Sequence, residues 1–166
     1  NEGLKRIEIR AFRECTSLRN INFPSTLEEI EIEAFNNCHN LVTVELNEGL
    51  KVIGEKAFYD CRSLRNIHFP STLEEIEERA FNRCDNLVTA ELNEGLKVIG
   101  EEAFSRCTSL RNVNFPSTLE KIEKNAFNSC VILVTVELNE GLRMTGEDAF
   151  AECPSLRNIN FPSTLE

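Results

Sequence analysis

Residues 24–46 read PSTLEEIEIEAFNNCHNLVTVEL, and this arrangement recurs every 23 residues along the 166-residue chain without insertion or deletion. A fixed period of this length is typical of a solenoid, in which stacked units share one core. The cysteines mark the period most plainly: Cys15, Cys38, Cys61, Cys84, Cys107, Cys130 and Cys153. We therefore expect one single-domain array built from units 1–23, 24–46, 47–69, 70–92, 93–115, 116–138 and 139–161, followed by a partial unit 162–166.

Each unit has eight apolar positions, in the pattern L-x-x-I-x-x-x-A-F-x-x-C-x-x-L-x-x-(I/V)-x-(F/L). Alternation over 41–46 predicts a short strand whose Thr43 and Glu45 side chains face water. The step at 27–30 indicates a second extended piece at a corner, and the Ala-Phe-x-x-Cys run at 34–38 predicts a tight helical or 3₁₀ turn. Because one unit cannot bury its apolar face alone, we expect the strands of successive units to pair into a parallel sheet.

A second period of 46 residues is superposed, because odd units open with Asn-Glu-Gly and even units with Pro-Ser-Thr. Glycine at the third repeat position, counted from the start of each unit, suits a turn with positive φ, and proline fixes an extended entry. Position 5 alternates in sign along the chain, from Lys5 and Glu28 to Arg143 and Glu166. We expect these charges to pair between neighbouring units and to specify register. The alternative is that duplication merely copied an accidental pair.

The formal net charge of −10 argues against nucleic acid as a partner, because phosphates require a basic surface. Much of the acidity lies at repeat positions 8 to 10, where eleven acids face four bases. We interpret this acidic tract as a solubility feature of one edge of the stack. No apolar run approaches the ~20 residues of a membrane span. Since no charged-then-apolar leader opens the chain either, we expect no membrane insertion and see no export signal.

The cysteine column allows three interpretations. A disulfide framework fits poorly, because the number of cysteines is odd and equivalent residues in adjacent units have parallel Cβ vectors. A zinc site requires clustered Cys or Cys and His separated by short loops, and the chain has no such pairs. We favour the third interpretation, in which each cysteine is a small buried apolar residue whose thiol hydrogen-bonds the backbone of a loop.

His68 occupies the outward repeat position 22, with Glu45 and Glu91 at the same position of the flanking units. One hypothesis is that the imidazole and two carboxylates hold a divalent metal. The other, which we favour, is a charge-paired column without metal. Elsewhere no nucleophile has a catalytic partner, and the isolated glycines match no phosphate-binding loop. We expect no enzyme activity, no cofactor and no metal site.

The exposed strand face is the best candidate for binding, because solenoids commonly bind through an extended sheet surface. Its outward column mixes Asn, Glu and His, and arginines alternate with valines along its lip, which leaves this face near neutral on an acidic protein. Polar groups with arginine suit a protein or glycan ligand. The alternative is ordinary solvated strand surface. The candidate ligand-binding residues are Arg19, Asn22, Glu45, Arg65, His68, Glu91, Arg111, Asn114, Glu137 and Arg157.

The runs LRNINFP at 18–24, LEEI at 27–30 and AF at 34–35, repeated down the chain, resemble the BspA-like class of leucine-rich repeats, also called the Treponema pallidum type. The resemblance implies an α/β leucine-rich-repeat solenoid with a parallel β-sheet face and short helical or 3₁₀ turns. Proteins of this class are typically bacterial or protist surface proteins, some of them adhesins. For this chain it therefore implies a non-enzymatic protein- or glycan-binding role and a cell-surface or extracellular location.

Repeat arrays need terminal caps with a polar outer face, and neither end of this sequence shows one. A piece of a longer array and a consensus-style engineered array are both compatible with that pattern. So is a head-to-tail homo-oligomer formed through the uncapped ends. The alternative to a binding module is accordingly a structural spacer or self-assembling element.

Overall fold

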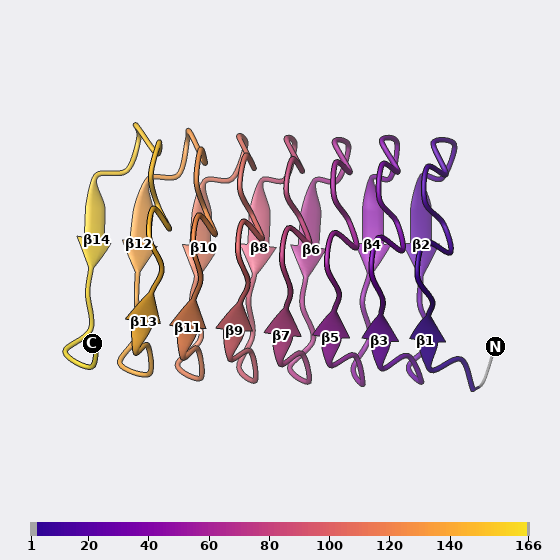
Figure 1. The fold of residues 1–166 in the computed structure, drawn as a ribbon, viewed down its shortest axis with the longest axis horizontal. Coiled ribbons are helices and arrows are strands. Elements are labelled where there is room, and N and C mark those ends of the chain that lie inside the picture. Colours follow the sequence, from indigo (N-terminus) through magenta and orange to yellow (C-terminus); the bar gives the residue numbers. More distant parts are fainter. Residues whose placement is uncertain (1–2, 166) are drawn as a thin grey trace.

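The computed structural model describes residues 3–165 as a stack of similar turns, with the two chain ends at opposite ends of the stack (Figure 1). Each complete turn contributes one strand to each of two sheets, and the described residues contain no helix. Sheet A consists of β1 (Arg6–Ile7), β3 (Glu29–Ile30), β5 (Val52–Ile53), β7 (Glu75–Ile76), β9 (Val98–Ile99), β11 (Lys121–Ile122) and β13 (Met144–Thr145). Sheet B consists of β2 (Asn20–Asn22), β4 (Thr43–Glu45), β6 (Asn66–His68), β8 (Thr89–Glu91), β10 (Asn112–Asn114), β12 (Thr135–Glu137) and β14 (Asn158–Asn160).

Every strand pair is parallel and joins residues one repeat apart. Ile7 pairs with Ile30 in sheet A, and Ile21 pairs with Val44 in sheet B. The 23-residue period therefore places each residue on its equivalent in the next unit. This confirms the predicted stacking and the predicted strand at 41–46, in which Val44 is buried between exposed Thr43 and Glu45. The second extended piece is confirmed too, and it forms a sheet of its own.

The prediction of a helical or 3₁₀ turn after the second extended piece was wrong. Repeat positions 8 to 15 form successive single turns in which backbone N–H groups alternate between two directions. Ala34 N donates to Glu31 O within its unit at 3.2 Å, whereas Phe35 N donates to Ala57 O of the next unit at 2.8 Å. A helix would keep these donors inside one unit, but the stack uses every second one to join neighbours.

Positions 10 and 14 of every unit adopt positive φ between 53° and 62°, although none of these residues is glycine. Each is the third residue of a four-residue turn such as 31–34, where a type II turn requires φ > 0. A left-handed conformation costs an ordinary L-residue about 1–2 kcal/mol. The inter-unit hydrogen bonds made by this segment offset that cost.

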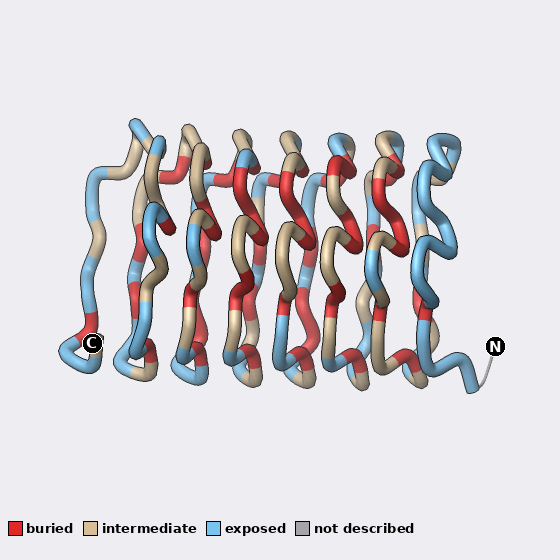
Figure 2. Tube along the Cα trace, viewed as in Figure 1, coloured by how far each residue is buried: buried red, intermediate tan, exposed pale blue. Residues whose placement is uncertain are grey.

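The core is one continuous column of apolar side chains enclosed by the two sheets and the turns. In the central turns the Leu, Ile, Ala, Phe and Cys positions are fully buried, whereas the first turn is largely exposed (Figure 2). The repeat-position-12 phenylalanines stack face to face, with ring centroids 5.1–5.4 Å apart and interplanar angles of 2–8°: Phe12, Phe35, Phe58, Phe81, Phe104, Phe127 and Phe150. Aromatic stacking thus runs the length of the array.

The 46-residue period has a direct structural cause at the unit openings. The Glu48 carboxylate accepts hydrogen bonds from Ser71 N at 3.2 Å and Ser71 Oγ at 3.0 Å. The Thr72 hydroxyl donates to Leu50 O at 2.8 Å and accepts from Gly49 N at 2.9 Å. Asn-Glu-Gly of an odd unit and Pro-Ser-Thr of the next even unit are therefore complementary surfaces.

Glycine is required where the odd units turn. Gly49 and Gly95 have φ of 113° and 117°, as predicted. Gly141 was predicted to share this conformation but is not among the positive-φ residues. A Cβ at Gly141 would nevertheless lie 2.1 Å from Ser117 O, so close backbone approach, rather than φ, explains this glycine.

The predicted pairing at repeat position 5 is confirmed at Glu28 and Glu74, whereas Glu120 and Arg143 form no ion pair among the described residues, and Glu166 lies outside them. Lys97 Nζ lies 2.6 Å from Glu74 Oε2, Lys5 hydrogen-bonds Glu28, and Lys51 lies 3.7 Å from the same Glu28 carboxylate. The hydrogen bond from Lys97 lowers the pKa of the Glu74 carboxyl. Because the pairs are exposed, their contribution to stability is small, and their role in specifying register stays a prediction.

Candidate binding surfaces

The outward face of sheet B displays all ten predicted site residues, and every one is exposed. Parallel register places the repeat-position-22 side chains in one row, where His68 pairs with Glu91, Glu91 with Asn114, and Asn114 with Glu137. The alternation of each strand sends position 21 into the core and positions 20 and 22 outward. The structure therefore brings the predicted residues together on one surface, and it does not test whether they bind anything.

The four arginines of the predicted site lie just before their strands, along the upper border of sheet B. Their backbones continue the ladder: Val88 N donates to Arg65 O at 2.7 Å, and Arg111 N donates to Val88 O at 3.3 Å. Within residues 3–165, no carboxylate lies within 4.0 Å of the charged nitrogens of Arg19, Arg65, Arg111 or Arg157. These guanidinium groups keep their donors available to a ligand.

A shallow hollow of about 380 Å³ lies on the sheet B face over β10 and β12. Asn112, Asn114, Thr135 and Glu137 line it, with Val113 at its base. Amide, hydroxyl and carboxylate groups offer both donors and acceptors there. Two of the predicted residues, Asn114 and Glu137, belong to this hollow.

His68 contacts one of its two flanking carboxylates. Its Nδ1 lies 2.8 Å from Glu91 Oε2, and its Nε2 lies 3.3 Å from Asn93 Nδ2. Among the hydrogen bonds of the described residues, none joins His68 to Glu45, and no group of three His, Cys, Asp or Glu in that part of the chain is arranged to hold a metal ion. This geometry fits the charge-paired column and offers no support for the metal hypothesis.

From Cys38 to Cys130 the cysteine column is buried and hydrogen-bonded, as the favoured interpretation predicts, whereas Cys15 is exposed and Cys153 is half-buried. Each thiol from Cys38 onward donates to the carbonyl of the Phe at repeat position 12 in the preceding unit, over 3.1–3.3 Å. Burial raises the pKa of Cys38 to about 11 and the pKa of Cys84 well above its usual range. All seven cysteines are free thiols. Neutral, buried thiols are poor nucleophiles, so this column is structural.

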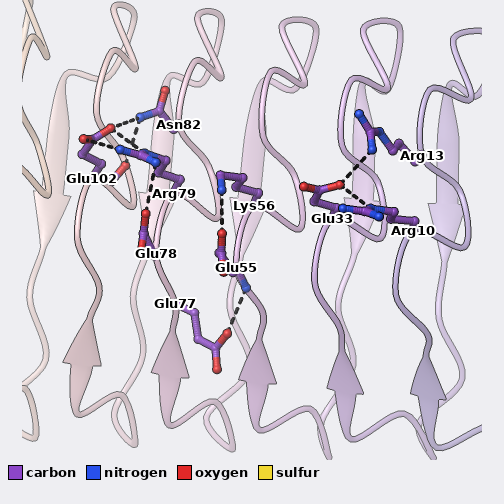
Figure 3. Close-up of polar contacts among 10 residues, drawn as sticks. All are labelled: Arg10, Arg13, Glu33, Glu55, Lys56, Glu77, Glu78, Arg79, Asn82 and Glu102. Carbon is purple, nitrogen blue, oxygen red and sulfur yellow. Dashed lines mark hydrogen bonds and ion pairs between the residues drawn. The ribbon is translucent and has the colours of Figure 1, made fainter.

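The turn face, formed by the outward side chains of repeat positions 9, 10, 13 and 14, holds the acidic tract. Basic residues neutralise much of it (Figure 3). Arg10 Nε lies 2.7 Å from Glu33 Oε2, and Arg79 forms two 2.9 Å hydrogen bonds with Glu102. These hydrogen bonds lower the pKa of both carboxyls. Acids that look like one continuous charged edge in the sequence are thus held in local ion-pair networks.

A groove of about 500 Å³ crosses this turn face. Most of its lining is basic or amide-bearing: Arg13, Asn36, Asn37, Lys56, Tyr59, Arg79, Asn82, Arg83, Glu102 and Arg106. Sequence analysis missed it because repeat position 13 differs from unit to unit and forms no repeated column. The available signal was the pair of arginines, Arg83 and Arg106, at position 14 of adjacent units.

The model for the BspA type leucine-rich repeat region matches residues 1–107 and 74–166, in six copies. The chain belongs to the BspA-type leucine-rich repeat family. This confirms the resemblance and the solenoid architecture. No curated protein matches the chain. No helix among residues 3–165 is long and apolar enough to cross a bilayer.

Solved structures of several leucine-rich proteins share the architecture. The chain matches a leucine-rich repeat protein of Bacteroides ovatus with a TM-score of 0.90 and 35% identity, covering 97% of this chain and 42% of that one. A leucine-rich cell surface protein of Faecalibacterium prausnitzii matches with a TM-score of 0.83 and 31% identity, over 92% and 41% of the two chains. The T. pallidum leucine-rich repeat protein matches at 0.87 and 32%, over 95% and 75%. The chain thus spans less than half the length of the first two.

Proposed function

We propose that this BspA-type array is a non-catalytic binding module whose protein or glycan ligand lies across the face of sheet B. The observation that carries the proposal is the in-register row of exposed polar side chains along seven parallel strands. Such a row presents hydrogen-bonding groups about 4.8 Å apart to an extended ligand. The arginine border and the hollow at Asn114 and Glu137 add charge and shape to this surface.

The non-catalytic part of the proposal rests on how the reactive groups are used. The buried thiols are kept neutral, and the hydroxyls of Ser71 and Thr72 are engaged at the unit openings. Both histidines lie against carboxylates: His68 against Glu91, and His39 against Asp60 at 2.9 Å. Among the described residues, neither histidine hydrogen-bonds a serine, threonine or cysteine that it could activate as a general base.

We also propose that the module acts at the cell surface or outside the cell. Support comes from the F. prausnitzii relative, which is named a cell surface protein.

The test is capture on an array of matrix proteins and glycans, using the intact chain and the double variant Arg65→Glu plus Arg111→Glu. We expect the variant to lose most of the captured signal at unchanged unfolding midpoint. The matched control, Arg83→Glu plus Arg106→Glu, makes the same charge change on the turn face and should leave capture by sheet B intact. No captured ligand, or capture indifferent to the first pair of changes, would reject the proposal.

End-to-end self-association is a second candidate, favoured by apolar side chains exposed at both ends of the stack. Phe12 stacks on Phe35 at 5.1 Å and remains 37% exposed, while Phe161 is 58% exposed. Head-to-tail contact of this kind does not close and yields dimers or filaments. Light scattering that grows with protein concentration, and that Phe12→Glu abolishes, would support it. A concentration-independent monomer mass would exclude it.

A further inference from the structure

The turn face carries two neighbouring arginines that the ion-pair networks leave out. Arg83 and Arg106 occupy repeat position 14 of successive units and both have φ of 62°. Arg83 N donates to Ser105 O and Arg106 N to Asn128 O, so the two backbones lie on successive rungs of the stack. Successive rungs are about 4.8 Å apart where backbones pair. Both guanidinium groups carry positive charge, so an anion placed between them would be attracted by both.

Two of the carboxylates near this pair, Asp60 and Glu102, are already bound by other groups, whereas Asp85 lines the same hollow as both arginines without an ion pair among the described residues. Asp60, on the rung before Arg83, accepts both Arg62 nitrogens at 3.0 Å and His39 at 2.9 Å. Glu102 is held by Arg79, as described above. In the described part of the chain, no carboxylate oxygen lies within 4.0 Å of the charged nitrogens of Arg83 or Arg106. Their guanidinium donors therefore remain open to a ligand.

The arginine pair also forms a ridge between two hollows. Both residues line the groove of about 500 Å³ described above and a second one of about 480 Å³ on the Asp60 side. Asn37 and Tyr59, both half-buried, line the first groove and contribute an amide and a phenol ring to it. The second hollow also holds the carboxylates of Asp60, Asp85 and Glu152, so an anionic ligand on the ridge would extend into the first groove, whose lining is mostly basic or amide-bearing.

We propose that Arg83 and Arg106 form an oxyanion site that binds a sulfate group of a sulfated oligosaccharide lying along the turn face. Two guanidinium forks match a tetrahedral oxyanion, which accepts several charge-assisted hydrogen bonds. The groove's amides and phenol suit sugar hydroxyls and the apolar face of a sugar ring. A peptide has less to engage here, because the backbone N–H groups of the turns are already used within and between units.

The site is separate from the sheet B surface. Because the protein has a net charge of −10, the two arginines must attract an anion at short range. Distant surface charges are screened at physiological salt, where the Debye length is about 8 Å. Binding through these two arginines should therefore weaken as NaCl is raised. Uncharged substitutions on the face of sheet B should leave this binding unchanged.

Titration calorimetry with a sulfated dextran oligosaccharide, and with its unsulfated parent, tests the proposal. We expect the sulfated probe alone to bind, and Arg83→Gln plus Arg106→Gln to raise its Kd by about tenfold or more, since charge-assisted hydrogen bonds are lost. The matched control, Arg65→Gln plus Arg111→Gln, removes the same charge from the sheet B border and should leave the Kd unchanged.

A lysine pair, Arg83→Lys plus Arg106→Lys, keeps both charges and should retain more affinity than the glutamine pair. Equal losses in both pairs, equal losses in the sheet B control, or equal binding of the unsulfated dextran would each overturn the proposal. A phosphoserine peptide that binds more tightly than the sulfated probe, with the same arginine dependence, would overturn the assignment to a sulfated sugar. Failure here leaves the sheet B proposal intact, because the variants and ligands differ.

Discussion

At the scale of the residue, the cysteines show how one position serves the stack. From Cys38 onward, each thiol donates to the backbone carbonyl of a stacked phenylalanine in the unit before it. Sequence analysis could predict this, because an apolar column with a weak donor has few other uses. The same burial keeps the thiols protonated, and the stability of the array should therefore depend on pH.

We expect the free energy of unfolding to fall steeply above about pH 9. The folded-state pKa of Cys38 is raised to about 11 and that of Cys84 is raised further, relative to a reference value of 9.0. Between these limits the unfolded chain has released protons that the native chain still binds, so stability is full below the unfolded pKa and is lost as pH rises. Each such thiol contributes a slope of about 1.4 kcal/mol per pH unit.

The measurement is urea unfolding between pH 8 and pH 10.5 for the intact chain and for Cys84→Ala. We expect the variant to be less stable at pH 8, since it loses the sulfur and its hydrogen bond. Its free energy of unfolding should, however, fall less steeply as pH rises. Cys15→Ala, which removes an exposed thiol, is the comparison for a change outside the core. Parallel curves for the intact chain and Cys84→Ala would contradict this account of the column.

At the scale of the element, the turn segment is where sequence reasoning failed. Type II turns normally show glycine or asparagine at their third residue, yet positions 10 and 14 here carry Arg, Glu, Lys, Asp and Ser as well as Asn. The residues therefore carried no turn signal that could be recognised. The left-handed backbone is fixed by hydrogen bonds between units, which a single repeat does not reveal.

Relieving the left-handed conformation should stabilise the array. Arg106→Gly replaces an exposed residue with φ of 62° and no ion pair among the described residues. We expect the free energy of unfolding to rise by about 0.5–1 kcal/mol, the gain from removing a strained Cβ less the added freedom of the unfolded chain. Arg106→Ala retains the Cβ and should give no such gain in the same denaturant titration. A glycine variant no more stable than the alanine variant would show that the turn is unstrained.

At the scale of the whole molecule, the period alone determined the architecture, because residues 23 apart had to stack in register. The sheet B residues followed from the same repetition. The groove on the turn face did not, since its lining comes from variable positions of several units. Residues that recur in every unit predict the framework and the surfaces that the units share. Residues that differ between units form a site only when folding brings several units together.

The complementary unit openings predict that the array tolerates loss of a unit only where the alternation survives. Deleting 70–92 joins two odd units, removes the Ser71 partner of Glu48 and places Lys51 beside Lys97. Deleting 139–166 also leaves six complete units but keeps the alternation. We expect the internal deletion to unfold at a clearly lower urea concentration than the terminal one, because it loses hydrogen bonds and gains like-charge contacts.

Circular dichroism during urea titration of both deletions provides the comparison. Equal midpoints would mean that the two unit types are interchangeable. A further variant, Lys97→Gln in the internal deletion, removes the like charge beside Lys51 without placing an acid beside Glu120, and it should recover part of the lost stability. If stability does not recover, the loss comes from the missing Ser–Glu hydrogen bonds alone.

The thiol column gives every rung of the stack its own built-in reporter of opening. A cysteine reacts with an alkylating agent only when its rung parts from its neighbour, so the order in which these sites are labelled follows the route by which the array unzips. Cys15 is exposed and Cys153 half-buried, whereas the five between them are buried. Mass spectrometry of partly labelled chains would thus chart fraying from the ends inward, turn by turn, without any engineered probe.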